Sequence, residues 1–148
     1  MSWKPDITVA AVVERDGHFL VVEERINNRL VYNQPAGHVE AGEDFLQAVR
    51  RETLEETAWH FEPKWLLGVY RWHVPGKPRS TLRFAYAGSV RDHDPRRTLD
   101  TPVVAAHWLT RTQLLALPAR TPMVMQCIDD YLAGARLPLN TVMSAANS

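Results

Sequence analysis

Residues 37–57 read GHVEAGEDFLQAVRRETLEET, and this segment gives the strongest structural signal in the sequence. From Glu43 to Thr57 it contains no Pro or Gly, and Gly42 immediately precedes it, which predicts a helix. At about 100° per residue, the less polar side chains of this helix form one stripe that can pack against a core. The stripe contains Phe45, Leu46, Val49, Thr53 and Thr57.

Glu52, Glu55 and Glu56 share an arc about 100° wide on the same helix, and this arc overlaps the edge of the stripe. Three carboxylates that are close together and partly buried repel each other, and burial raises their pKa values. A hard divalent cation such as Mg²⁺ removes this cost, because it binds carboxylate oxygens and often bridges to substrate phosphates. The alternative is an exposed helix whose glutamates pair with Lys or Arg elsewhere.

The residues around this arc follow the spacing G-x5-E-x7-R-E-x-x-E-E, formed by Gly37, Glu43, Arg51, Glu52, Glu55 and Glu56. The pattern resembles the Nudix box, which marks hydrolases of a nucleoside diphosphate linked to another moiety. Residues 33–40 resemble the lead-in loop of that family.

Two positions depart from the Nudix pattern. Ala58 stands where the family has Gly, and Thr53 stands where it usually has a bulky aliphatic residue. The Gly normally ends the helix in a left-handed conformation, so we expect Ala58 to cost about 1 kcal/mol in backbone strain and to shift the helix end. We expect Thr53 to weaken the packing slightly.

The resemblance implies an α/β fold of the Nudix type, an α/β/α sandwich around a central mixed sheet. It also implies that Mg²⁺, or alternatively Mn²⁺, is held by Glu52, Glu55, Glu56 and the backbone carbonyl of Gly37. Arg51 and Glu43 resemble the pair that orients the glutamate at position 52.

The general base differs among family members. One option is Glu55 or Glu56, and the other is an acidic residue on a distant loop, for which Asp100 is the first candidate, ahead of Asp92 and Asp94. The alternative for each loop aspartate is simple solvation.

Within the family, four segments are similar to a small bacterial phosphatase branch: residues 8–10, 19–24, 33–38 and 82–84. Members of that branch act on nucleoside di- and triphosphates, hydroxymethylpyrimidine pyrophosphate and thiamine pyrophosphate. Alternatives are an ADP-ribose or dinucleoside polyphosphate pyrophosphatase, and a sensor that binds a nucleotide without cleaving it.

The substrate needs an aromatic partner for its ring and positive charge for its phosphates. Tyr32 and Trp72 are the stacking candidates, with core packing as the alternative for both. Arg25, Arg71 and Arg83 are the phosphate candidates, and a plain surface position is the alternative for each. His38 is expected to be a loop histidine rather than a metal ligand.

In the rest of the chain, β-branched and apolar runs predict strands, and the remaining segments predict two helices, a turn and loops. Strands are expected over 7–14, 18–24, 30–33, 65–74, 81–90 and 105–109, and helices over 110–117 and 122–133, with Thr121 as a cap and Pro122 at the first helical position. Residues 15–17 form a hairpin turn, residues 35–37 and 91–102 form loops, Pro63 opens a new segment, and residues 145–148 form a frayed tail.

Composition limits the remaining possibilities. The chain has 148 residues and a formal net charge of zero, which predicts one domain over 1–148 and argues against a basic nucleic-acid-binding protein. No apolar run approaches the length of a membrane helix, and the N-terminus lacks the pattern of a secretory signal. The only cysteine, Cys127, is expected to be buried, and a reducing cytoplasm is the expected compartment.

The net charge of zero includes two segments of opposite charge. Residues 37–56 hold six acidic and two basic residues, and residues 62–97 hold three acidic and eight basic ones. We therefore expect a small phosphorylated molecule, with its metal ion, as the partner, and no nucleic acid or membrane. The sequence leaves monomer and homodimer equally open.

Overall fold

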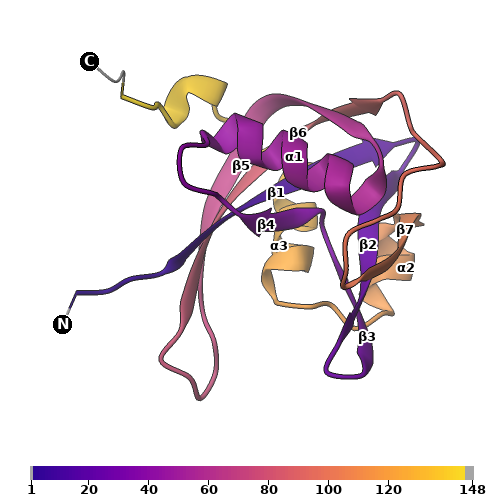
Figure 1. The fold of residues 1–148 in the computed structure, drawn as a ribbon, viewed down its shortest axis with the longest axis horizontal. Coiled ribbons are helices and arrows are strands. Elements are labelled where there is room, and N and C mark those ends of the chain that lie inside the picture. The colour runs from indigo at the N-terminus through magenta and orange to yellow at the C-terminus, as the bar shows by residue number, and fades with distance from the viewer. Residues whose placement is uncertain (1, 146–148) are drawn as a thin grey trace.

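The computed structural model describes residues 2–145 and contains a seven-stranded mixed sheet with helices on both faces (Figure 1). The strands are β1 (Asp6–Arg15), β2 (His18–Ile26), β3 (Arg29–Asn33), β4 (Ala36–His38), β5 (His60–His73), β6 (Ser80–Arg91) and β7 (Val103–Thr110). The helices are α1 (Phe45–Thr57), α2 (Arg111–Leu115), α3 (Met123–Leu132) and the short 3-10 turn η1 (Leu139–Thr141). The predicted α/β sandwich with a mixed sheet is therefore confirmed. No helix among residues 2–145 is long and apolar enough to cross a membrane.

Strand β1 lies at the centre of the sheet and is apolar on both faces. It runs parallel to β6 and antiparallel to β2 and β4, while β7 pairs with β2 and β5 with β6. Because successive side chains of a strand point to opposite faces, β1 supplies two cores. Val9, Ala11 and Val13 pack on the side of α1, and Ala10 and Val12 pack on the side of α3.

The helix expected over 43–57 begins at Phe45, and Asp44 caps it. The Asp44 side chain accepts a hydrogen bond from the backbone N–H of Gln47, and the Gln47 side chain accepts one from the backbone N–H of Asp44. This reciprocal capping box satisfies backbone donors that the first turn would leave free.

The helix ends at Thr57, and Ala58 itself adopts the left-handed conformation, with φ 62° and ψ 16°. The expected shift of the helix end is therefore wrong. Ala58 accepts the strain because its backbone N–H donates to the Leu54 carbonyl at 2.9 Å and its side chain is buried.

Two other expectations near the strands are wrong. Residues 36–38 are not a loop, because they form β4 and pair with β1 in the register Val9 with Gly37. Pro63 does not open a segment, because β5 begins at His60 and Pro63 lies within it at a register shift. A proline is tolerated at such a bulge because the ladder is interrupted there.

The remaining strand and helix predictions are confirmed to within a few residues. In the hairpin turn between β1 and β2, Asp16 and Gly17 both have positive φ, as a tight hairpin requires. Helix α3 begins one residue later than expected, and the Thr121 hydroxyl still accepts a hydrogen bond from the Met123 N–H at 3.2 Å. Cys127 is buried, as expected. Of the predicted tail, residues 146–148 lie outside the described part of the chain.

Candidate active site

Arg51 is the centre of the acidic face of α1. Its Nε and Nη2 donate to the two carboxylate oxygens of Glu43 at 2.7 and 2.9 Å. Its Nη1 donates to Oε1 of Glu52 at 2.9 Å and to Oε1 of Glu55 at 2.7 Å. The hydrogen bonds from Arg51 hold the pKa of Glu43 below its usual range, and the bond to Glu43 does most to raise the pKa of Arg51. One guanidinium therefore fixes three carboxylates.

The Glu52 carboxylate lies directly against the backbone of Gly37 on β4. A Cβ at Gly37 would overlap the carboxyl carbon and both carboxylate oxygens of Glu52. Only glycine can therefore occupy position 37 while Glu52 keeps this position. Burial raises the pKa of the Glu52 carboxyl, and Arg51 partly opposes that rise.

Glu56 is the most buried carboxylate of the face, at 8% exposure. Its Oε1 accepts a hydrogen bond from the backbone N–H of Ala36 at 2.8 Å. Burial raises the pKa of Glu56 to about 9, and the neighbouring charges of Glu52 and Glu24 add to the rise. A group with this pKa is protonated at neutral pH unless a cation takes the place of the proton.

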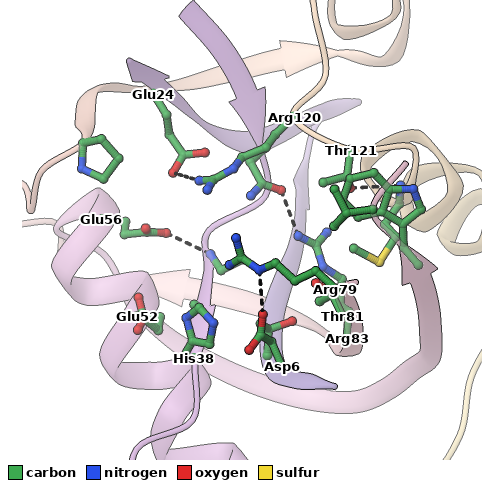
Figure 2. A pocket seen from close by; sticks show the side chains of 18 of the residues that line it. Asp6, Glu24, His38, Glu52, Glu56, Arg79, Thr81, Arg83, Arg120 and Thr121 are labelled. Atoms are coloured by element: carbon green, nitrogen blue, oxygen red, sulfur yellow. Dashed lines mark hydrogen bonds and ion pairs between the residues drawn. The ribbon is translucent and has the colours of Figure 1, made fainter. Parts of the chain in front are cut away.

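Glu52 and Glu56 line a pocket of about 490 Å³ that carries opposite charges on its walls (Figure 2). The carboxylates of Glu24, Glu52 and Glu56 lie on one side of the view, and the arginines extend from the top to the opposite side. The arginines are Arg79, Arg83 and Arg120, and the lining also includes Asp6, Thr81, Trp72, Thr121 and Met123. Such a pocket suits a ligand that carries both negative charge and a metal ion.

Arg83 lies at the pocket with only 3% exposure. Its Nη1 donates to the Gln34 side chain at 2.8 Å and its Nη2 to the Asn33 side chain at 3.0 Å. The Gln34 amide in turn donates to the Val124 carbonyl on α3 at 2.8 Å. Both partners are neutral amides, so within residues 2–145 no direct ion pair compensates the charge of Arg83. Burial lowers its pKa.

Glu24 and Arg120 form an ion pair at the pocket wall that the sequence analysis missed. The Nη1 of Arg120 donates to Oε2 of Glu24 at 3.0 Å, and Glu24 is 2% exposed. The residues are 96 positions apart in sequence. Asp6 and Arg79 form a second, exposed pair at 3.3 Å and were also missed. No local pattern signals either pair, because each joins residues that lie far apart in sequence.

The aromatic and arginine candidates from the strands divide between the pocket and other surfaces. Trp72 and Arg83 line the pocket, whereas Arg25 and Arg71 do not. Arg71 lies over the Trp3 ring, with its guanidinium carbon 5.4 Å from the ring centroid, beside a separate hollow. The reason is the strand pleat, since Arg71 precedes Trp72 and Arg25 follows Glu24, so each points to the opposite face.

The Tyr32 ring does not line the pocket, because it packs 6.4 Å from the His107 ring, between centroids. Its backbone carbonyl accepts a hydrogen bond from the Arg120 N–H at 2.8 Å. His38 does line the pocket, and its carbonyl accepts a hydrogen bond from Nη2 of Arg51 at 3.1 Å.

The loop aspartates are exposed and their side chains do not line the pocket. The backbone N–H of Asp100 donates to the Glu55 carbonyl at 2.9 Å, which holds this loop against the end of α1. Asp94 is held in the same way by the Ala58 carbonyl at 3.0 Å, and Asp92 accepts a hydrogen bond from Arg91.

The carboxylates of α1 have the donor chemistry for a divalent cation, although within residues 2–145 no three His, Cys, Asp or Glu side chains form a ready metal cluster. Glu52 and Glu55 are instead bonded to Arg51, and Glu56 faces the pocket. The close approach of Gly37 to Glu52 brings the backbone of β4 next to this carboxylate. Oxygen donors of this kind fit Mg²⁺.

Comparisons with known proteins identify the family. Residues 4–127 match the family model described as the NUDIX domain. The curated Phosphatase NudJ of Escherichia coli K12 is 38% identical over 141 residues, covering 95% of this chain and 92% of that protein. The chain therefore belongs to the Nudix family, and it is a Nudix hydrolase.

Solved structures show the same fold. A NUDIX hydrolase from Nitrosomonas europaea superposes with a TM-score of 0.94 and 45% identity, covering 98% of this chain and 100% of that one. The NUDIX domain of Shewanella oneidensis NrtR, solved in complex with ADP ribose, shares only the fold, with a TM-score of 0.72, 18% identity and 88% coverage of each chain. Nudix hydrolases generally use a divalent metal ion such as Mg²⁺ and act on small phosphorylated substrates.

Proposed function

We propose that this chain, as a single domain, hydrolyses phosphoanhydride bonds in nucleoside di- and triphosphates or related small pyrophosphates, including those of the thiamine pathway, with Mg²⁺. The observation that carries the proposal is the face of α1, where Arg51 holds Glu52 and Glu55 while the buried Glu56 lines a pocket with three arginines. The similarity to a curated phosphatase over 95% of this chain supports the reaction class.

Glu52, Glu55, Glu56 and the Gly37 carbonyl would hold the metal ion in this proposal. When bound, the ion neutralises phosphate oxygens and lowers the pKa of a water molecule. Arg51, itself held by both oxygens of Glu43, orients Glu52. Mn²⁺ has the same oxygen preference and is the alternative ion.

Two further roles are the acceptor of the proton from water and the stacking partner of the substrate ring. Glu56, which lines the pocket, or Glu55, which Arg51 holds, accepts the proton of the attacking water. The Asp100 side chain is exposed and does not line the pocket. Trp72 is the one aromatic side chain among the described residues that lines the pocket, and it stacks against the ring of the substrate.

The test is product analysis on a panel of phosphorylated compounds, with Mg²⁺ or with EDTA. The panel contains nucleoside di- and triphosphates, thiamine pyrophosphate, hydroxymethylpyrimidine pyrophosphate, ADP-ribose and a dinucleoside tetraphosphate. We expect Mg²⁺-dependent release of orthophosphate from the first four. Nucleoside monophosphate as the main product from the last two would favour the alternative pyrophosphatase activities.

Glu55→Gln and Glu56→Gln should each lower turnover at least about tenfold, because each removes a metal-binding charge. Glu62→Gln is the matched control, since Glu62 is a surface residue of β5 that pairs with Arg50 at 3.5 Å. A folded protein that binds one of these compounds and leaves it intact with Mg²⁺ would contradict the proposal and favour a sensor.

A further inference from the structure

The ion pair of Glu24 and Arg120 lies outside α1, yet it shares the pocket with the carboxylates of that helix (Figure 2). Glu24 comes from β2 and Arg120 from the segment between α2 and α3. Glu24 is almost completely buried, whereas the side chain of Arg120 is 40% exposed. The pair therefore presents its cation, and not its anion, to an incoming ligand.

The backbone holds Arg120 in place independently of its side chain. Its N–H donates to the Tyr32 carbonyl at 2.8 Å, and the Tyr32 N–H donates to the Pro118 carbonyl at 2.9 Å. These bonds align residues 118–120 with β3 in a short parallel bridge. With its Cα fixed and its Nη1 bonded to Glu24, the guanidinium has little freedom left to lose when a ligand binds.

The pair has unused hydrogen-bonding capacity. Within residues 2–145, Nε and Nη2 of Arg120 make no hydrogen bond, and the buried Oε1 of Glu24 has no partner. The free Nε and Nη2 donors of Arg120 can bond to phosphate oxygens while Nη1 stays bonded to Glu24.

The pair also lies close to Glu56. Glu24 and Arg120 line the same pocket as Glu52 and Glu56. A phosphate chain bound to a cation at Glu52 and Glu56 would therefore extend within reach of the Arg120 guanidinium.

We propose that Arg120 binds the phosphate chain of the substrate and that the buried Glu24 is the positioning residue that holds Arg120 toward it. This inference rests on the proposed function, because it assumes that a phosphorylated ligand enters this pocket. The planar guanidinium suits phosphate through paired N–H donors, a geometry that lysine does not reproduce.

The test measures binding of inorganic pyrophosphate by calorimetry in EDTA, where neither metal binding nor turnover contributes. We expect Arg120→Gln to weaken binding about tenfold to a hundredfold, the effect of one charge-assisted hydrogen bond to a ligand. Arg120→Lys should recover part of the loss, because it keeps the charge without the fork. Arg111→Gln, a surface arginine paired with Asp129 and outside the pocket, should bind like the wild type.

A double-mutant cycle separates positioning from a merely structural role. Glu24→Gln should weaken pyrophosphate binding in the wild-type background but cause no further loss in the Arg120→Gln background, because it acts through Arg120. In turnover assays with Mg²⁺, Arg120→Gln should raise KM more than it lowers kcat. Melting curves confirm that each variant is folded.

The inference is overturned if the wild type does not bind pyrophosphate, if Arg120→Gln binds it as tightly as the wild type, or if Glu24→Gln is equally harmful in both backgrounds. The proposed function fails separately. A wild type that binds pyrophosphate through Arg120 but hydrolyses nothing supports the inference alone, and normal turnover with unchanged KM in Arg120→Gln contradicts the inference alone.

Discussion

Gly37→Ala should damage metal binding without damaging the fold. The new Cβ would overlap the Glu52 carboxylate, so Glu52 must leave the position in which Nη1 of Arg51 bonds it at 2.9 Å. A hydrogen bond between charged groups contributes about 1.5–3 kcal/mol. The Mg²⁺ concentration for half-maximal activity should therefore rise by about 10- to 150-fold.

The free energy of unfolding in EDTA should fall by no more than the contribution of the lost Arg51–Glu52 hydrogen bond, about 1.5–3 kcal/mol. The backbone adds no strain, because Gly37 is not among the residues with positive φ and alanine adopts its conformation. Gly68→Ala is the matched control. It makes the same change in β5, where the new Cβ would lie 3.2 Å from the Tyr70 hydroxyl. Its Mg²⁺ dependence should remain that of the wild type.

The assay is a Mg²⁺ titration of orthophosphate release, combined with thermal unfolding in EDTA. Repeating Gly37→Ala in a Glu52→Gln background isolates the cause, since the alanine should then have little left to disturb. An unchanged Mg²⁺ requirement in Gly37→Ala, or an equal loss in both backgrounds, would refute the steric reasoning.

Three further predictions concern stability and are measured by thermal or denaturant unfolding. The pKa of Glu56 is about 9 in the folded protein and lies above its value in the unfolded chain. The contribution of this carboxyl to the stability of the metal-free protein should therefore be complete below about pH 4.5 and should be lost as the pH rises toward 9. Glu56→Gln should abolish this loss and be more stable than the wild type at pH 8 in EDTA by at least about 1 kcal/mol, and equal pH profiles would contradict it. Ala58→Gly should stabilise by about 0.5–1 kcal/mol by removing left-handed strain at φ 62°, and a lower Tm would show that the lost methyl group matters more. Arg15→Gln should cost about 1–2 kcal/mol and leave turnover unchanged, because the guanidinium lies 4.9 and 5.0 Å from the ring centroids of Trp59 and Trp108 and donates to a backbone carbonyl. An unchanged stability of Arg15→Gln would mean that these contacts contribute nothing.

Local patterns predicted most of the elements correctly. Periodicity predicted the helix over 43–57, and turn chemistry predicted the hairpin at Asp16 and Gly17. Both agree with the observed bounds to within a few residues. The errors lie where pairing with a distant strand overrides the local signal. Residues 36–38 follow Pro35 and include Gly37, which locally favour a loop, yet they pair with β1 in the sheet.

The two positions that depart from the Nudix box show what a family pattern does not predict. A missing glycine predicted a displaced helix end, but the chain keeps the end in place and holds Ala58 in the strained conformation. Thr53 is buried, and its hydroxyl donates to the Val49 carbonyl at 2.7 Å, so it meets the hydrogen-bonding need that its polarity creates.

The acidic face could be derived from the sequence because the geometry of a helix is local. Residues at i, i+3 and i+4 share a face whatever surrounds them, so Glu52, Glu55 and Glu56 had to lie together, and Arg51 was the neighbouring cation. This arrangement is enough to suggest a metal-assisted reaction, but it contains no information about the rest of the pocket.

The opposite wall of the pocket was decided by the tertiary structure. Glu24 and Arg120 meet across 96 residues, and Arg83 reaches Asn33 across 50. Strand alternation alone allows either face to be the inner one, so the sequence could not choose Trp72 over Arg71 or Glu24 over Arg25. The register of the sheet makes that choice, because it buries one set of side chains in the pocket and turns the other toward solvent.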